Sequence, residues 1–194
     1  MLVYCHCALL FDTIATMQSI DETNCPNSLP VRRQLHHVPP VGVSQYVEHA
    51  EYFITVCVDR AHYGIPLTAA GRRGPLANDA IASDILDAVE FRMTIGEWYP
   101  CVALVMPDHV HFIAAFARDA AIDKTVASWK RFLARKCGIV WQKGFFDHRL
   151  RSDEERAEKW RYIENNPVAS GLCVAAEDWP FRRMWSRSGE VVSQ

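Results

Sequence analysis

Two apolar runs in the middle of the chain lie almost end to end, and they restrict the fold more than any other feature. Residues 98–106 and 109–116 are dominated by apolar side chains, and only Pro107 and Asp108 separate them. A two-residue connection of this composition is typical of a tight turn between antiparallel strands. The sequence therefore predicts two adjacent antiparallel strands over residues 98–116.

The segments around this pair alternate between strand-like and helix-like patterns. Residues 52–58 are rich in β-branched and aromatic side chains, which is typical of a buried strand. Residues 76–95, about 121–137 and 152–167 predict helices, and residues 139–142 predict a short extended piece. Ser152 and Glu155 form a capping box for the third helix, and Pro167 is expected to end it. This order predicts an α+β domain whose antiparallel sheet is covered by helices on one face.

The first 44 residues lack such a pattern, because prolines and an Asn-Cys-Pro-Asn stretch interrupt any sustained period. We expect an irregular N-terminal segment over 1–44, one domain over 45–186 and a C-terminal tail over 187–194. Cys5, His6 and Cys7 resemble a fragment of a metal site. The sequence holds no partner pair to complete it, which favours packing or a disordered terminus.

Composition excludes a globally basic nucleic-acid-binding protein but leaves room for local binding. The 21 Lys and Arg residues are balanced by 23 Asp and Glu residues, for a net charge of -2. Residues 124–163 nevertheless hold 11 basic and 5 acidic residues. Such a region can bind a polyanion, although a solvated helix surface would look the same. Seven cysteines without a Cys-x-x-Cys pair argue against a zinc ribbon or a disulfide framework, and the short apolar opening indicates no membrane helix, so a soluble cytoplasmic protein is expected.

His109 and His111 lie two residues apart in the second apolar run. Alternate residues of a strand point to the same face, so both imidazoles are able to reach one metal ion. The spacing alone leaves open the alternative of two packed or surface histidines.

Tyr162 and Asn166 lie four residues apart on the expected third helix and therefore share one of its faces. Taken singly, such a tyrosine packs at the edge of a core, and an asparagine before proline stops a helix. Taken with the histidine pair, they suggest a divalent ion held by two imidazoles and the Asn166 carbonyl, next to a Tyr162 hydroxyl that attacks a phosphate. No Gly-x-x-x-x-Gly-Lys loop occurs, so ATP is not implied.

A band of basic and aromatic residues runs from the expected second helix to residue 151. Interleaved cations and rings suit single-stranded or hairpin nucleic acid, since cations contact phosphates and rings stack on bases. The candidate DNA-binding residues are Lys130, Arg131, Arg135, Gln142, Lys143, His148, Arg149 and Arg151. Within the helix, Trp129, Phe132 and Leu133 are expected to face the core, while the charges between them remain available.

Three motifs follow one another along the chain: MPDHVHF at 106–112, WQKGFFDHRLR at 141–151 and YIENNPVASGL at 162–172. Together they resemble the motifs of the REP-associated tyrosine transposases, and DWPF at 178–181 resembles the C-terminal part of that family. These proteins are single-tyrosine members of the HUH transposases, which are named for a His-hydrophobic-His motif. The resemblance covers roughly residues 52–185 and does not extend to the N-terminal segment.

The resemblance implies a ferredoxin-like antiparallel sheet, with the histidine pair on a central strand and the tyrosine on a following helix. It implies Tyr162 as the nucleophile, and His109, His111 and Asn166 as ligands of Mg²⁺ or Mn²⁺. The implied substrate is single-stranded DNA that carries a hairpin, such as a REP palindrome, cut through a covalent 5′-phosphotyrosine. It also favours a monomer over a dimer and a cytoplasmic, nucleoid-associated protein.

The leading hypothesis is therefore a metal-dependent single-strand DNA endonuclease and strand transferase. A non-catalytic binder of palindromic DNA or structured RNA would keep the fold and the basic band. A phosphodiesterase in which water attacks would leave no protein-linked DNA. A purely structural or interaction protein would make the paired histidines and the shared face of Tyr162 and Asn166 coincidences.

Overall fold

The computed structural model describes residues 49–186 and 189–192. The segment expected over 1–44, with its Cys-His-Cys stretch, lies outside the described residues. Of the C-terminal tail, the description covers 189–192.

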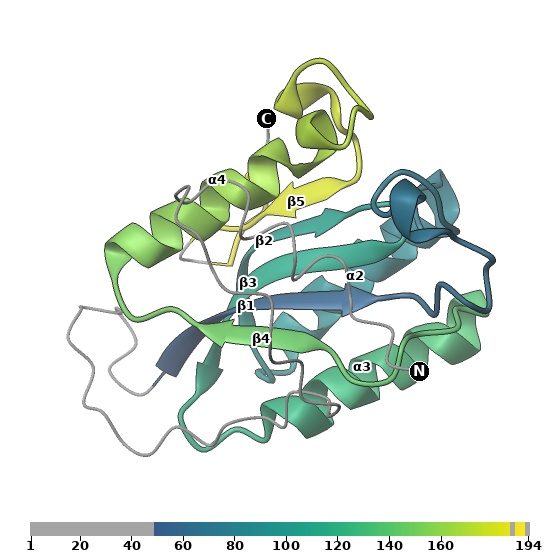
Figure 1. Ribbon diagram of the computed structural model, residues 1–194. Coiled ribbons are helices and arrows are strands. Elements are labelled where there is room, and N and C mark those ends of the chain that lie inside the picture. Colours follow the sequence, from purple (N-terminus) through teal and green to yellow (C-terminus); the bar gives the residue numbers. More distant parts are fainter. Residues whose placement is uncertain (1–48, 187–188, 193–194) are drawn as a thin grey trace, which may run out of the picture.

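Five antiparallel strands form one sheet in the order β4-β1-β3-β2-β5 (Figure 1). The strands are β1 (His49–Cys57), β2 (Tyr99–Val105), β3 (His109–Ala117), β4 (Phe146–Arg149) and β5 (Arg182–Met184). The helices are α2 (Asp79–Thr94), α3 (Ile122–Cys137) and α4 (Asp153–Ala169), with short 3₁₀ turns η1 (Leu67–Ala69) and η2 (Ala176–Asp178). The predicted pair of antiparallel strands is confirmed, because β2 and β3 are neighbours joined through Pro107 and Asp108.

The first four strands with α2 and α3 make a β-α-β-β-α-β unit, which is the ferredoxin-like arrangement. The predicted fold class is thus confirmed. β5, which the sequence patterns did not predict, extends the sheet beyond β2 through pairs such as Ala103 with Arg183. The final short strand of the unit lies at Phe146–Arg149 and not at 139–142, where Trp141 makes only an isolated bridge to Val58.

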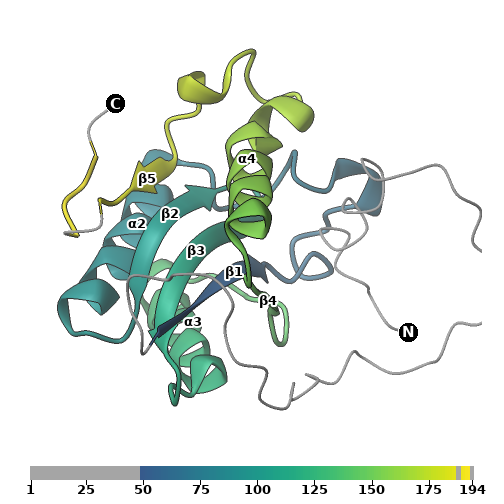
Figure 2. The ribbon, with the colours of Figure 1, turned by 90° about the vertical axis from the view of Figure 1, so that its left-hand side faces the viewer.

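Helices cover both faces of the sheet, so the expectation of helices on one face is wrong. On one face, Val110, Phe112 and Phe116 of β3 belong to the core that includes residues of α2 and α3. On the other face, Ile113 shares a second core with Ile163 of α4. Figure 2 shows α4 across the sheet from α2 and α3. The side chains of β3 are buried on both faces, because each face packs against a helix layer.

The C-terminal end of α4 differs from the prediction, because Pro167 lies inside the helix. The helix continues to Ala169 and stops where Gly171 adopts a φ of 70°. The Gly171 N–H donates to Val168 O at 2.9 Å, and the Leu172 N–H donates to Pro167 O at 2.9 Å. This pair of bonds is a Schellman motif, which needs a residue in the left-handed region. The glycine therefore sets the end of the helix, and Asn166 stays within it.

Of the capping box predicted at the start of α4, the structure contains the Ser152 half but not the Glu155 half. The Ser152 hydroxyl accepts a hydrogen bond from the Glu155 N–H at 3.2 Å. The Glu155 carboxylate accepts from the Arg151 N–H at 2.8 Å, one residue earlier than a capping box requires. The first bond occupies a backbone donor that a helix start would otherwise leave unpaired, and the second pairs the N–H of the residue before the N-cap.

Candidate functional site

The start of β3 places two imidazoles on the sheet face that α4 covers. His109 and His111 are 2% and 0% exposed, and their ring centroids lie 4.5 Å apart. Ile113, the next residue on this face, packs in the core shared with α4. The alternation of strand side chains therefore brings both rings beneath α4, as the spacing of the motif predicts.

His111 is held between β1 and α4. Its Nδ1 lies 2.8 Å from the Thr55 hydroxyl, which comes from the directly paired residue of β1. Its Nε2 lies 3.2 Å from Nδ2 of Asn166, whose side chain is buried. A ligating Nε2 requires the ring proton on Nδ1, and the Thr55 oxygen is placed to accept that proton.

His109 is held by the aspartate that precedes it. Its Nδ1 lies 2.6 Å from Asp108 Oδ1, which also accepts a hydrogen bond from the Gly71 N–H at 3.1 Å. The second carboxylate oxygen accepts from Arg60 Nε at 2.8 Å, and Asp108 is fully buried. This carboxylate suits a ring whose proton is on Nδ1 and whose Nε2 is a metal ligand.

Tyr162 lies over the same group of rings. Its ring centroid is 5.4 Å from that of His111 and 5.9 Å from that of Phe53, in edge-on contacts. Asn166 follows it by one helical turn. The structure thus brings together the four residues predicted for catalysis and metal binding, from β3 and α4.

The donor set fits a divalent ion. Two neutral imidazoles and an amide oxygen leave such an ion its full charge and open positions. Asn166 presents either its nitrogen or its oxygen to the site by rotation of the amide. In the described part of the chain, no group of three His, Cys, Asp or Glu residues is placed to hold a metal ion. The candidate site consequently depends on the asparagine as its third ligand.

The turn before His109 packs tightly against the loop that precedes α2. A Cβ placed on Gly74 would lie 2.1 Å from Pro107 O and 2.6 Å from Pro107 C. The Leu76 N–H also donates to Pro107 O at 3.0 Å. No side chain fits between these two stretches of backbone, so they set the position of the histidine turn together.

Gly74→Ala is therefore expected to lower the free energy of unfolding by about 2 kcal/mol, as overpacking does. Urea denaturation measures the change. Gly64→Ala is the matched control, because a Cβ there meets no atom within 4 Å although φ is +62°. That backbone conformation alone costs about 1 kcal/mol. An equal loss in both variants would show that the close approach at Pro107 has no energetic role.

The predicted DNA-binding residues do not form one surface. Arg131 and Arg135 are exposed on α3, across the sheet from the histidines. The Lys130 ammonium donates to Gln142 O at 2.7 Å and to Gly144 O at 2.5 Å. Burial lowers the pKa of Lys130 to about 8. Lys130 therefore holds the loop before β4. Trp129 and Leu133 lie in the core as predicted. Phe132 is 39% exposed, because it lies at the edge of the helix face that buries Trp129 and Leu133, so its expected place in the core is wrong.

β4 carries part of the predicted band to the edge of the site. His148 pairs with Phe53 in the β-sheet register, so its side chain is on the α4 face, whereas Arg149 is on the other. Phe146 is 37% exposed, and its ring lies 6.2 Å from that of Phe53. The remaining predicted residues, Gln142, Lys143 and Arg151, lie in the connections on either side of β4.

Sequence analysis missed the residues that hold the two histidines. Thr55 gave one usable signal, because a hydroxyl within an apolar strand needs a hydrogen-bond partner. Asp108 was read only as a turn residue. Its partner Arg60 is 48 positions away, so no local spacing could connect them.

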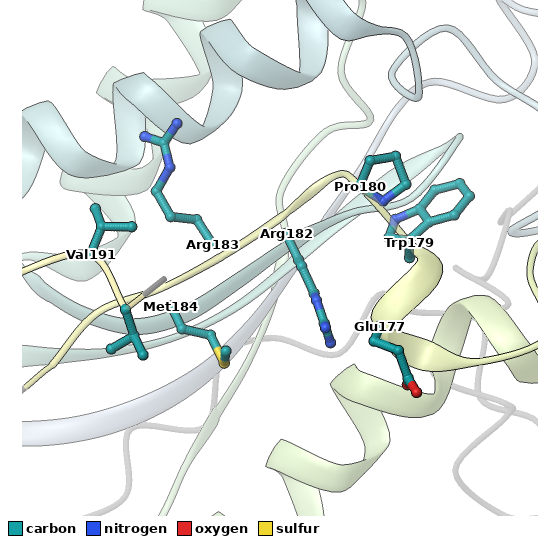
Figure 3. Close-up of a pocket in the computed structure, with 8 residues that line it drawn as sticks. Glu177, Trp179, Pro180, Arg182, Arg183, Met184 and Val191 are labelled. Atoms are coloured by element: carbon teal, nitrogen blue, oxygen red, sulfur yellow. The ribbon is translucent and has the colours of Figure 1, made fainter. Parts of the chain in front are cut away.

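A shallow hollow lies at the other edge of the sheet (Figure 3). It is lined by residues of η2, β5 and the C-terminal stretch, including Trp179, Arg182 and Met184. None of the four candidate site residues lines it. No helix in the described ranges is long and apolar enough to span a bilayer.

The structure thus combines a ferredoxin-like sheet with a His-hydrophobic-His pair that faces a tyrosine on a helix. The chain is similar to two proteins described as REP-associated tyrosine transposases. One, from Haemophilus influenzae, is 30% identical in an alignment of 107 positions that covers 44% of this chain and 60% of the relative. The other, from Escherichia coli K12, is 30% identical in an alignment of 83 positions that covers 40% of this chain and 49% of the relative.

The fold comparison agrees with these matches. A solved structure of a REP-associated tyrosine transposase bound to a REP hairpin is 23% identical, with a TM-score of 0.55. The likeness covers 69% of this chain and 75% of that one, and it shows a shared fold. No family model matches the chain. The chain aligns with about half to three-fifths of the length of its curated relatives.

Proposed function

We propose that this protein is a metal-dependent single-strand DNA endonuclease and strand transferase that acts at hairpin-bearing repeats. The observation that carries the proposal is the convergence of Tyr162 and Asn166 of α4 on the histidine pair of β3. A tyrosine that only packed against a core would not need two buried imidazoles, each held by an oxygen at Nδ1. The similarity to REP-associated tyrosine transposases supports the same reading.

In the proposed reaction, the Tyr162 oxygen attacks the phosphorus of a DNA phosphodiester. A P–O bond to tyrosine forms while the bond to the 3′ oxygen breaks. The 3′ oxygen gains a proton, the tyrosine loses one, and the 5′ end stays linked to the protein. A 3′-hydroxyl from another strand then attacks the same phosphorus and releases Tyr162. The linkage conserves the energy of the phosphodiester, so rejoining needs no ATP.

His109, His111 and Asn166 would hold a Mg²⁺ or Mn²⁺ ion, which would polarise the phosphate and stabilise the charge that develops on it. Asp108 and Thr55 orient the two rings through their Nδ1 atoms. α4 and the sheet shield this face from water, because both histidines are buried. The chain's own groups would thus hold the nucleophile and the two imidazoles in fixed positions relative to one another.

The proposed substrate is a hairpin with a single-stranded flank. The solved relative of this fold is bound to a REP hairpin, and hairpin ends present single-stranded phosphates to a buried site. We further propose that the protein acts as a monomer in the cytoplasm on nucleoid DNA.

The test is a denaturing gel of the full chain with a labelled single-stranded hairpin. We expect label linked to protein in Mn²⁺, none in EDTA, and recovery when Mn²⁺ is restored. Hairpin binding measured in EDTA serves as the control, because phosphate contacts by cations do not need the metal. Equal adduct in EDTA would contradict the role given to the two histidines and Asn166.

Two other products would replace the proposal with an alternative. Cleaved DNA with free ends and no adduct would indicate attack by water. Tight hairpin binding with no cleavage in Mn²⁺ would indicate a binding protein of the same fold.

A further inference from the structure

We propose that Arg72 and Arg73, called the arm below, bind backbone phosphates of the DNA strand beside the histidine pair. The inference rests on the proposed function, because it assigns a contact to the strand that the site would cut. Arg72 and Arg73 lie outside the basic band that the sequence indicated. Their position follows from how the loop before α2 is attached to the site.

The loop is fastened to the same carboxylate that holds His109. The Gly71 N–H donates to Asp108 Oδ1 at 3.1 Å, and a Cβ on Gly71 would lie 3.9 Å from Cε1 of His109. The same Cβ would lie 3.1 Å from the Ser170 hydroxyl at the C-terminal cap of α4. Consecutive Cα atoms are about 3.8 Å apart, so both arginines leave the backbone within two residue steps of this contact.

The charge of the loop has no local counterpart. Residues 60–78 contain three arginines and no aspartate or glutamate. Arg60 is paired with Asp108, whereas Arg72 and Arg73 are exposed and form no ion pair with any described residue. A guanidinium binds a phosphate through two parallel hydrogen bonds, which makes arginine well suited to a nucleic-acid backbone.

Two parts of the chain border the site and would lie beside a strand whose phosphate reaches Tyr162. On one side, β4 presents Phe146, whose ring packs against Phe53. On the other side, the loop closes over His109 and the end of α4, at the same end of the sheet in Figure 1. The strand must continue past both sides, because the reacting phosphate lies within it. The two exposed guanidiniums meet its backbone on the loop side.

The test compares two double variants of the full chain, Arg72→Gln with Arg73→Gln and Arg118→Gln with Lys124→Gln. Arg118 and Lys124 are also exposed and without an ion pair in the described structure, and they lie near the opposite end of β3. Binding of a fluorescent single-stranded hairpin with flanks is measured in EDTA across a range of salt concentrations. We expect the loop variant to bind about tenfold more weakly at 0.15 M salt, with a log–log salt slope smaller by about 1.4, as two lost phosphate contacts predict. The control variant should keep both values.

A third variant, Arg72→Lys with Arg73→Lys, separates charge from loop structure. It should recover most of the salt slope, because the charges return. A loop variant that binds like wild type, or no more weakly than the control, would overturn the proposal. So would a lysine variant that binds as weakly as the glutamine variant.

Failure of the arm and failure of the proposed cleavage are distinguishable. Hairpin binding measured in EDTA tests the role of Arg72 and Arg73. The covalent adduct of the wild-type protein tests the proposed cleavage. Adduct formation with unchanged binding of the loop variant would overturn the arm alone. Weakened binding of the loop variant without wild-type adduct would support the arm and reject the cleavage.

Discussion

Tyr162→Phe should eliminate the covalent protein–DNA product and leave hairpin binding close to wild type. The substitution removes the only atom that forms the new bond to phosphorus in the proposed reaction. The phenyl ring remains to pack against His111 and Phe53, so the free energy of unfolding should change by less than about 1 kcal/mol. Adduct formation should fall by at least about 10³-fold, as loss of a nucleophile does. A denaturing gel with labelled hairpin and Mn²⁺ measures it.

Tyr52→Phe is the matched control for this experiment. Tyr52 lies on β1 but faces the other side of the sheet, where its ring contacts Phe116. Its loss of a hydroxyl should leave the adduct at wild-type amounts. Persistent adduct in Tyr162→Phe would assign the nucleophile to another residue. Loss of binding together with the adduct would assign Tyr162 a structural role instead.

Local patterns in the sequence predict the parts of this site that depend on one element at a time. The alternation within β3 places both histidines on one face, and the helical period places Tyr162 and Asn166 on one face. The Pro-Asp turn predicts that β2 and β3 are neighbours. Each of these inferences needs only the geometry of a strand, a helix or a turn.

The choice of sheet face for α4 does not follow from such patterns. β3 is buried on both faces and carries apolar side chains on each, so its sequence does not show which face α2 and α3 leave for a third helix. For the same reason, the basic residues of α3 looked like neighbours of the site, whereas Arg131 and Arg135 lie across the sheet. Periodicity identifies the inner side of a helix but not the sheet face on which it packs.

The network behind His109 is the part of the site farthest from sequence prediction, and Asp108→Asn tests it. An asparagine has one acceptor oxygen, so it cannot serve both Arg60 on one side and the Gly71 N–H with His109 on the other. Breaking this buried ion pair is expected to lower the free energy of unfolding by about 3 kcal/mol, measured by urea denaturation. Asp119→Asn, at an exposed position after β3, should cost less than about 0.5 kcal/mol.

The same variant should also weaken the metal site, because His109 loses the carboxylate that orients its ring. The Mn²⁺ concentration that gives half-maximal adduct is expected to rise about 10- to 100-fold, as for other partners of metal-binding histidines. This Mn²⁺ concentration is measured without urea, at a temperature where the variant is folded, and it separates the two roles of Asp108. A loss of stability with an unchanged Mn²⁺ requirement would limit Asp108 to holding Arg60 and the Gly71 loop. A raised Mn²⁺ concentration for half-maximal adduct would show that the carboxylate also sets the position of His109, because Asp108 would then affect metal binding through that ligand.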